Sequence, residues 1–312
     1  MADIKKVACL GAGTIGSSWA VYFLSKGLQV KIQDIDKNQI EIAKNKVTSF
    51  LNSIVGQGII SAEEMQTALK RASFTTSIAE AVEDAEFIQE SALERYDIKQ
   101  KVLEEVDAAA PGTAVFASSS SGLLVSRLQA FSKFPERVLV GHPFNPPHLI
   151  PLVEIVRGNA GDSSVQVAWE FYRQIGKVPI VINKEVPGHV ANRIQAAVWR
   201  EAIDLVVNGV CSVNDVDAAV CNGPGLRWAL MGPNMIFNLG GGDNGMEGFL
   251  GQFTAPFESW WADMAAWNQF PQGSQRALIE GLKEEIGDRN TGDIVRWRDE
   301  KLIGLLKLRD LL

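Results

Sequence analysis

Short apolar runs alternate with amphipathic stretches through the first part of the chain. Apolar runs bounded by turn residues are typical of buried strands, and apolar residues three or four positions apart are typical of helices. Strands are predicted at residues 4–10, 28–32, 87–88, 113–117, 138–141, 152–156 and 178–182. Helices are predicted at residues 17–24, 40–51, 97–109 and 164–175, with a capping box at Ser61 opening a further helix. This alternation indicates an α/β fold with a mostly parallel sheet.

The pattern changes at His189, because apolar residues then recur at helical spacing, as residues 192–205 illustrate. We therefore predict two domains. Residues 1–185 form a Rossmann-type, doubly wound domain, and residues 186–312 form an all-α domain. Helical domains of this kind commonly pair, so we expect a homodimer formed through the C-terminal domain.

A glycine turn follows the first predicted strand and precedes the first helix. Asp34 follows the next predicted strand and lies eighteen residues after the last glycine of the turn. Strand, glycine turn, helix and acid in this order indicate a dinucleotide site, because the glycines admit pyrophosphate to the backbone and the acid accepts from a ribose hydroxyl. The charge of Asp34 would repel a 2′-phosphate, which favours NAD over NADP. The candidate cofactor residues here are Gly11, Gly13, Thr14, Ile15, Gly16 and Asp34.

His142 opens the stretch His-Pro-Phe-Asn-Pro-Pro, and Glu154 follows twelve positions later. Prolines at 143, 146, 147 and 151 forbid a helix between the two residues, so their side chains can meet across a short reversal. A histidine exchanges protons near neutral pH, and a carboxylate can orient its ring and stabilise its charge. The pair is our candidate for acid–base chemistry, with a purely structural histidine as the alternative.

The composition narrows the range of partners. The net charge is −7 and no basic run is present, which argues against nucleic acid and anionic membranes and leaves small molecules. No apolar window has the length of a membrane span, and no signal sequence precedes the first strand. Three widely spaced cysteines, at positions 9, 211 and 221, form no disulfide or zinc pattern and are expected to be buried thiols. We expect a cytoplasmic protein without a metal site.

Several motifs in one order resemble the 3-hydroxyacyl-CoA dehydrogenase family, nearly from end to end. They are the glycine turn, the serine run 118–121, His142-Pro-Phe-Asn-Pro, Leu152-Val-Glu154 and Pro187-Gly-x-x-x-Asn192-Arg193. The resemblance implies hydride transfer from a 3-hydroxyl carbon to NAD. The serine run has the composition of an ordinary loop, but it follows a predicted strand end beside the nucleotide site, so we expect one hydroxyl to face the substrate.

The resemblance also implies roles for single residues. His142 would be the general base and Glu154 its partner, while Ser121 and Asn192 would contact the substrate oxygen. Asn192 has an alternative role as a helix cap. Two further residues, Glu94 and Lys99, would lie near the cofactor. Ser119 departs from the family, which usually has Asn there, and this weakens the transfer of the acyl-CoA substrate.

Two segments are similar to a branch of the family, the carnitine 3-dehydrogenases, and more distantly to L-gulonate 3-dehydrogenase and lambda-crystallin. They run from Gly223 to Pro233, including Arg227 and Trp228, and from Asn238 to Met246. Arg227 is our candidate ligand for a substrate carboxylate, because a guanidinium binds it in a bidentate fork. Aromatic faces bind a quaternary ammonium by cation–π attraction. Our candidates for this site are Trp228, Trp260, Trp261 and Trp267, together with Asp243. The alternative is that these tryptophans belong to a core or a dimer interface.

The sequence therefore leaves four hypotheses for the function. We favour oxidation of L-carnitine; the others are oxidation of L-gulonate or another short 3-hydroxy acid, oxidation of 3-hydroxybutyryl-CoA, and a non-catalytic role of the same fold. A CoA ester needs a basic site for its phosphates, but the lysines of residues 41–71 are balanced by acids. The intact pair His142 and Glu154 favours catalysis.

Overall fold

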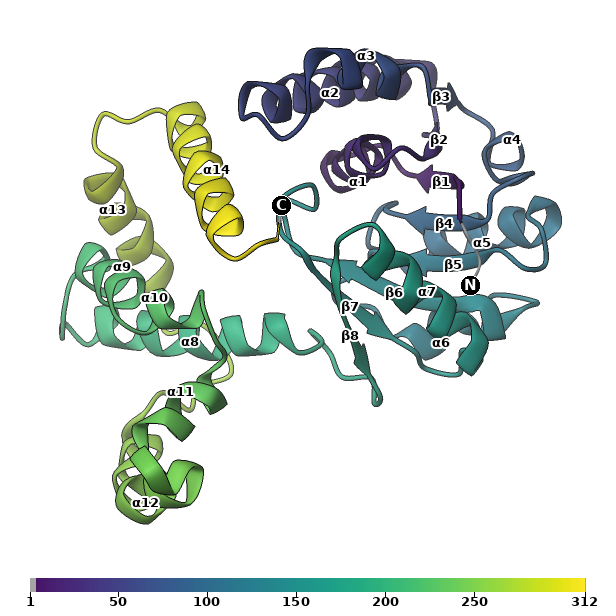
Figure 1. The fold of residues 1–312 in the computed structure, drawn as a ribbon. Helices are drawn as coiled ribbons and strands as arrows, with labels where there is room; N and C mark the ends of the chain where they lie inside the picture. The colour runs from purple at the N-terminus through teal and green to yellow at the C-terminus, as the bar shows by residue number, and fades with distance from the viewer. Residues whose placement is uncertain (1–3, 312) are drawn as a thin grey trace. The chain divides into compact units, whose positions relative to one another are not determined.

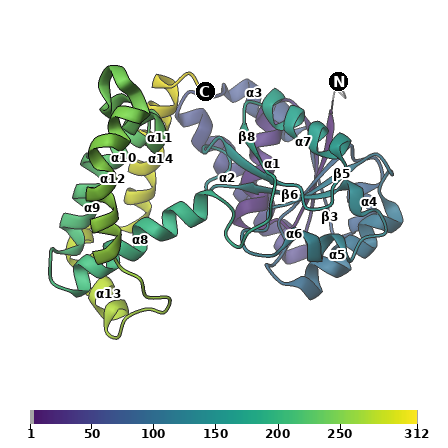
Figure 2. The same ribbon diagram turned by 90° about the horizontal axis from the view of Figure 1, so that it is seen from below.

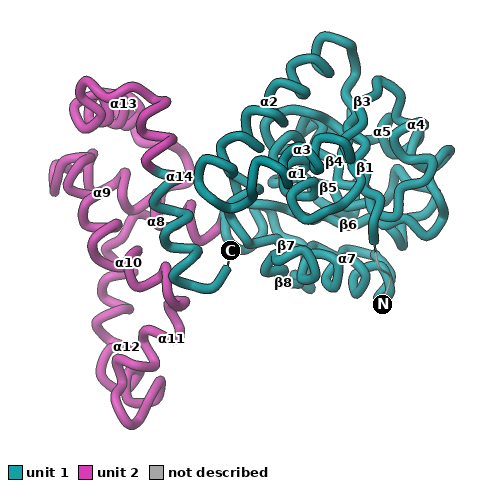
Figure 3. The backbone as a smooth tube through the Cα atoms, turned by 45° about the horizontal axis from the view of Figure 1, so that its top comes forward, with its two compact units in different colours: residues 1–192, 298–312 teal, residues 193–297 magenta. Residues whose placement is uncertain are grey.

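The computed structural model describes residues 4–311. These residues form two compact units, shown in two colours in Figure 3. The first unit extends to Asn192 and resumes at Arg298, and the second comprises Arg193–Trp297. The domain boundary that we predict at residue 185 remains a prediction.

A single eight-stranded sheet organises the first unit within the described residues (Figure 1). Its order is β3-β2-β1-β4-β5-β6-β7-β8, and every neighbouring pair is parallel except the antiparallel pair β6 and β7. This confirms the predicted doubly wound, mostly parallel sheet. The strands are β1 (Lys6–Leu10), β2 (Gln29–Gln33), β3 (Ala72–Thr75), β4 (Phe87–Glu90), β5 (Val115–Ser118), β6 (Val138–Pro143), β7 (Leu152–Val156) and β8 (Val178–Ile182).

Helices lie on both sides of this sheet (Figure 2). One core packs α1, α2, α3 and α7 against one face, and a second core packs α4, α5 and α6 against the other. Burial of apolar surface on both faces explains why the strands are continuous apolar runs. The helices are α1 (Thr14–Ser25), α2 (Lys37–Gly56), α3 (Ala62–Leu69), α4 (Ile78–Val82), α5 (Tyr96–Ala109), α6 (Val125–Gln129), the 3₁₀ helix η1 (Pro135–Arg137) and α7 (Asp162–Gln174).

The second unit is helical throughout, as predicted for the C-terminal part. The helix α8 begins at the end of the first unit, and α14 begins in the second unit and ends in the first. The helices are α8 (Ala191–Val207), α9 (Val213–Asn222), α10 (Pro224–Trp228), α11 (Pro233–Gly240), the 3₁₀ helix η2 (Gly242–Asn244), α12 (Gly245–Asp263), α13 (Ser274–Ile286) and α14 (Thr291–Leu308).

The predicted capping box is present at the start of α3. The Ser61 hydroxyl accepts from the Glu64 amide at 3.1 Å, and the Glu64 carboxylate accepts from the Ser61 amide at 2.7 Å. The pattern does not predict β3, because this four-residue strand at the edge of the sheet has no fully buried residue.

The cysteines correct one expectation. Cys9 is buried, but Cys211 is only partly buried and Cys221 is exposed, so the prediction of three buried thiols is wrong for the helical unit. Within the described residues no helix is both long and apolar enough to cross a membrane.

Candidate active site

His142 and Glu154 face one another across the antiparallel pair of strands. The register of β6 and β7 places their Cα atoms directly opposite, with the proline-rich reversal joining the strands. The His142 Nδ1 atom lies 2.8 Å from the Glu154 Oε2 atom. His142 is 5% exposed and Glu154 is fully buried, so the contact between the two side chains is shielded from water. The structure therefore brings together the two residues that the sequence pairs.

The second oxygen of Glu154 has partners of its own. Its Oε1 atom accepts from the backbone amides of Val190 and Ala191, both at 2.9 Å, at the start of α8. Burial raises the pKa of the Glu154 carboxyl, but the hydrogen bonds from His142 and the two amides outweigh burial and bring this pKa below its usual value. Glu154 is thus a carboxylate held in one orientation.

The proton on His142 follows from this geometry. A carboxylate only accepts hydrogen bonds, so the Nδ1 atom of His142 is the donor in the contact with Glu154. In the neutral ring the Nε2 atom then carries a lone pair and no proton. A ring with this tautomer can take a proton at Nε2, and the carboxylate behind it stabilises the charge that results.

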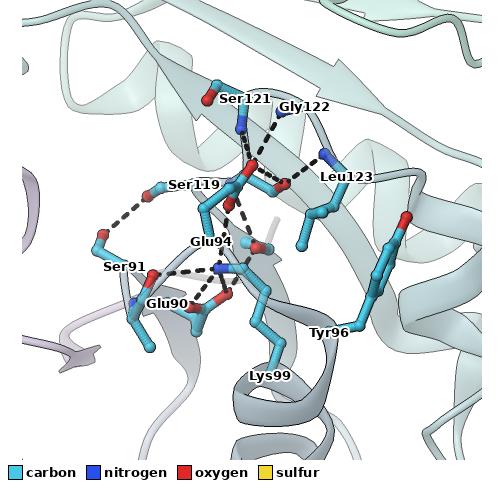
Figure 4. A network of polar contacts seen from close by, with 12 residues as sticks. Glu90, Ser91, Glu94, Tyr96, Lys99, Ser119, Ser121, Gly122 and Leu123 are labelled. Atoms are coloured by element: carbon cyan, nitrogen blue, oxygen red, sulfur yellow. Dashed lines mark hydrogen bonds and ion pairs between the residues drawn. The ribbon is translucent and has the colours of Figure 1, made fainter.

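The serine run forms a hydrogen-bonded loop around Glu94 (Figure 4). The Glu94 Oε1 atom accepts from the Ser120 hydroxyl at 2.7 Å and from the amides of Ser121 and Gly122 at 2.9 Å each. Burial raises the pKa of Glu94, but these bonds and the charge of Lys99 outweigh burial and lower it. Ser121 is exposed, so its side chain is open to a ligand.

Lys99 belongs to a buried ion pair that is not predicted from the sequence. Its Nζ atom lies 2.7 Å and 2.9 Å from the two carboxylate oxygens of Glu90, and Ser118 donates to the same carboxylate at 2.5 Å. Glu94 is farther away, at 3.6 Å. Glu90 is the last residue of β4, and Ser118 is the last residue of β5. In the sequence, the feature that indicates this site is a carboxylate at the carboxyl end of a predicted parallel strand.

The glycine turn has the geometry that a dinucleotide needs. Gly11 has a φ of +86°, and a Cβ atom on Gly16 would lie 1.8 Å from the Gly11 carbonyl oxygen, so both positions require glycine. A Cβ atom on Gly13 would meet nothing within 4 Å. The N-terminus of α1 has no side-chain cap and no acid in its first turn, so its free amides fit a pyrophosphate.

Asp34 lies beside this turn, at the end of β2. Its carboxylate accepts from the Ala12 amide and from the Ile35 amide, each at 2.7 Å. Lone pairs remain on both oxygens for ribose hydroxyls. Thr14 is exposed and Ile15 partly exposed at the start of α1, where they border the same turn.

The remaining predicted residues lie on helices. Asn192 is the second residue of α8, at the end of the first unit, and is partly exposed. Arg227 and Trp228 end the short helix α10 of the second unit, where both are exposed. Of the other candidate tryptophans, Trp267 donates from its Nε1 atom to Asp204 at 2.9 Å, and Trp260 and Trp261 contact Phe257.

The described residues hold no cluster of three or more His, Cys, Asp or Glu placed to bind a metal ion. The glycine turn with its acid, the buried pair of His142 and Glu154 and the match to an NAD binding domain together indicate a dehydrogenase that uses NAD. The model of the 3-hydroxyacyl-CoA dehydrogenase NAD binding domain matches residues 6–186, and that of the 3-hydroxyacyl-CoA dehydrogenase C-terminal domain matches residues 188–280. The chain belongs to the 3-hydroxyacyl-CoA dehydrogenase family and is an NAD-dependent 3-hydroxy acid oxidoreductase.

Similar proteins cover the chain almost completely. L-carnitine dehydrogenase of Nocardiopsis dassonvillei is 39% identical over 309 residues, which are 97% of this chain and 91% of the relative. L-carnitine dehydrogenase of Streptomyces griseus is 39% identical over 306 residues, which are 98% of this chain and 90% of the relative. Among solved structures, 5-formyl-3-hydroxy-2-methylpyridine 4-carboxylic acid 5-dehydrogenase, an NAD⁺-dependent dismutase, is 28% identical with a TM-score of 0.81, covering 98% of this chain and 97% of that chain.

Proposed function

We propose that this enzyme oxidises the 3-hydroxyl group of L-carnitine to the ketone, with His142 as the general base. The relatives named L-carnitine dehydrogenase support this substrate, since they match nearly the whole chain. The observation that carries the chemistry is the 2.8 Å contact between His142 and Glu154, which leaves the Nε2 atom of His142 as a basic nitrogen.

The base removes the hydroxyl proton at its Nε2 atom, and the Glu154 carboxylate stabilises the imidazolium that forms. Ser121 and Asn192 hold the substrate oxygen, whose charge changes as its proton leaves. NAD, when bound, supplies the acceptor for the hydride.

The cofactor is held by the glycine turn and the strand ends around it. The uncapped amides of α1 bind the pyrophosphate, and Asp34 accepts from a ribose hydroxyl. Glu94 borders the cofactor with the serine loop, and Lys99 acts through its buried pair with Glu90. We propose the turn residues Gly11, Gly13, Thr14, Ile15 and Gly16 as cofactor contacts.

Arg227 and Trp228 are our candidates for the far end of the substrate. A guanidinium binds a carboxylate through two parallel hydrogen bonds, and an indole face attracts a quaternary ammonium. Both side chains are exposed on α10 and thus available to a ligand. We also propose a homodimer formed through the helical unit, supported by its many exposed apolar side chains, and a cytoplasmic location, supported by the free cysteines.

The test is a panel of NADH production with L-carnitine, L-gulonate, L-3-hydroxybutyrate and 3-hydroxybutyryl-CoA. We expect the highest kcat/KM with L-carnitine. Turnover of the thioester alone would refute the proposed substrate, and turnover of gulonate alone would show that the substrate is a polyol acid. His142→Gln should abolish activity, whereas Glu185→Gln, a change of a carboxylate that accepts its hydrogen bonds from Ser126, should retain it. Full activity of His142→Gln would overturn the mechanism.

A further inference from the structure

His189 joins two segments that the proposed reaction brings together. It lies two residues before the start of α8, in the first compact unit, and is 3% exposed. Its ring packs against the ring of His142, with 5.1 Å between the centroids and a tilt of 57° between the planes. Neither the proton transfer nor the cofactor site uses this side chain, so its two other contacts need an explanation.

The first contact is made by the ring, to the serine loop. The Nε2 atom of His189 lies 3.0 Å from the carbonyl oxygen of Ser120. A carbonyl oxygen only accepts, so Nε2 carries a proton and donates the hydrogen bond. Ser120 is 1% exposed, so this bond satisfies a carbonyl group that is shielded from water. The bond also fixes the backbone directly before Ser121, whose side chain we propose to hold the substrate oxygen.

The second contact depends on the backbone. His189 has a φ of +52°, which non-glycine residues rarely adopt. A left-handed residue lets successive amides converge on one anion, and the next two amides, of Val190 and Ala191, both donate to the Glu154 Oε1 atom at 2.9 Å. Strained backbone of this kind persists where the surrounding contacts over-determine it, and it is frequent at active sites. The bond from the ring to Ser120 is such a contact, because it holds the strained residue and the turn that follows it.

The groups that we propose to meet at the substrate oxygen stand on three separate segments. His142 is on β6, Ser121 follows β5, and Asn192 is the second residue of α8. Hydrogen bonds of the sheet fix β5 against β6, but the loop after β5 and the start of α8 lie outside the strands. His189 is bonded through its ring to this loop and is continuous with α8.

We propose that His189 is a positioning residue, which holds Ser121 at its distance from the base by tying the serine loop to the turn that orients Glu154. The inference rests on the proposed roles of His142 and Ser121. In this role His189 exchanges no proton with the substrate. Its hydrogen bond to the Ser120 carbonyl affects kcat through the position of Ser121.

Two substitutions separate the hydrogen bond from the shape of the ring. His189→Phe keeps a ring but no donor, so the buried Ser120 carbonyl loses its bond. His189→Gln keeps an N–H donor near the position of Nε2. Tyr22→Phe is the matched control, because it removes a hydroxyl that donates to another buried carbonyl, that of Ile175, at 2.7 Å. For each variant, kcat is measured with the best substrate of the panel, and thermal unfolding is measured beside it.

We expect kcat to fall about tenfold in His189→Phe, because a small displacement of a group that contacts the substrate lowers the rate strongly. His189→Gln should recover most of this loss, and Tyr22→Phe should lower the unfolding temperature but not kcat. If His189→Phe does not fold, His189→Gly replaces it with the same expected loss, because glycine adopts a positive φ without strain. The inference is wrong if kcat stays within about twofold of the wild type, if Gln is no better than Phe, or if Tyr22→Phe loses as much rate.

A double-mutant cycle with Ser121→Ala shows whether the effect passes through Ser121. The effects of residues that act through one another are not additive, so His189→Phe should lower kcat by less than about twofold in the Ser121→Ala background. An equal loss in both backgrounds would overturn the inference and leave the proposed function intact. Inactivity of the wild type with every substrate of the panel, or full activity of His142→Gln or Ser121→Ala, would instead refute the proposed roles and the inference with them.

Discussion

The most informative single change is Glu154→Gln, which keeps the shape of the side chain and removes its charge. The amide oxygen of glutamine can still accept from the amides of Val190 and Ala191, which both lie 2.9 Å from Oε1 in the wild type. The side-chain NH₂ group then faces His142 Nδ1. Because an NH₂ group donates, the neutral imidazole must move its proton to Nε2, and the basic lone pair is lost from the catalytic side.

The size of the effect follows from the contact distance. With 2.8 Å between Nδ1 and Oε2, the centres of the two charges are about 4 Å apart, and two unit charges at that distance interact by about 4 kcal/mol at an effective dielectric constant of about 20. Loss of that stabilisation from the imidazolium lowers the rate about 10³-fold. The change of tautomer adds to this, and the corresponding change in a serine protease lowers kcat about 10⁴-fold.

The assay is steady-state NADH production with the best substrate of the panel. We expect kcat/KM to fall by at least about 10³-fold, with NAD binding measured by fluorescence close to the wild type. Glu185→Gln is the matched control, because Glu185 also accepts two hydrogen bonds, and both come from Ser126, from its amide and its hydroxyl. A folded Glu154→Gln enzyme with activity within tenfold of the wild type would refute the reasoning.

Three further predictions test other parts of the structure. Gly16→Ala should prevent folding or NAD binding, because its Cβ atom would lie 1.8 Å from a carbonyl oxygen. Gly13→Ala should unfold at the wild-type temperature, because its methyl group enters open space, but it should bind NAD more weakly, because that space is where we propose the pyrophosphate binds. Thermal unfolding and fluorescence titration with NAD check both. Lys99→Met should lower the free energy of unfolding in urea by about 3–5 kcal/mol, because it leaves the Glu90 carboxylate buried and unpaired. Burial lowers the pKa of His148 from 6.5 to about 4, so the unfolded chain binds more protons between these pH values. The free energy of unfolding should therefore fall by about 3 kcal/mol as the pH drops through that window, and a wild-type slope in His148→Asn would contradict this.

Local patterns predict much of the sheet and the central pair of the site. Continuous apolar runs indicate most of the strands, and the confirmed capping box at Ser61 depends on residues only three positions apart. The proline-rich reversal brings His142 and Glu154 together because antiparallel strands joined by a short segment pair residue by residue. Such features are predictable because they depend on neighbours in the chain.

Contacts between distant segments are not predictable in this way. The ion pair of Lys99 with Glu90 joins a helix to a strand end, and nothing in either segment alone shows that both charges are buried. His189 likewise has no local signal, since its neighbour His142 lies 47 positions earlier in the chain. The roles of Arg227 and Trp228 remain predictions, because they depend on a bound substrate.

The last helix has a consequence for the order in which the protein matures. Ile303 and Leu306 of α14 form a small apolar cluster with Leu149, which lies in the reversal between His142 and Glu154. The ribosome synthesises α14 after all the strands of the sheet, and proteins generally begin to fold from the N-terminal side during synthesis. Because α14 supplies two of the three buried side chains of this cluster, the reversal between His142 and Glu154 can reach its full packing only after α14 has been synthesised.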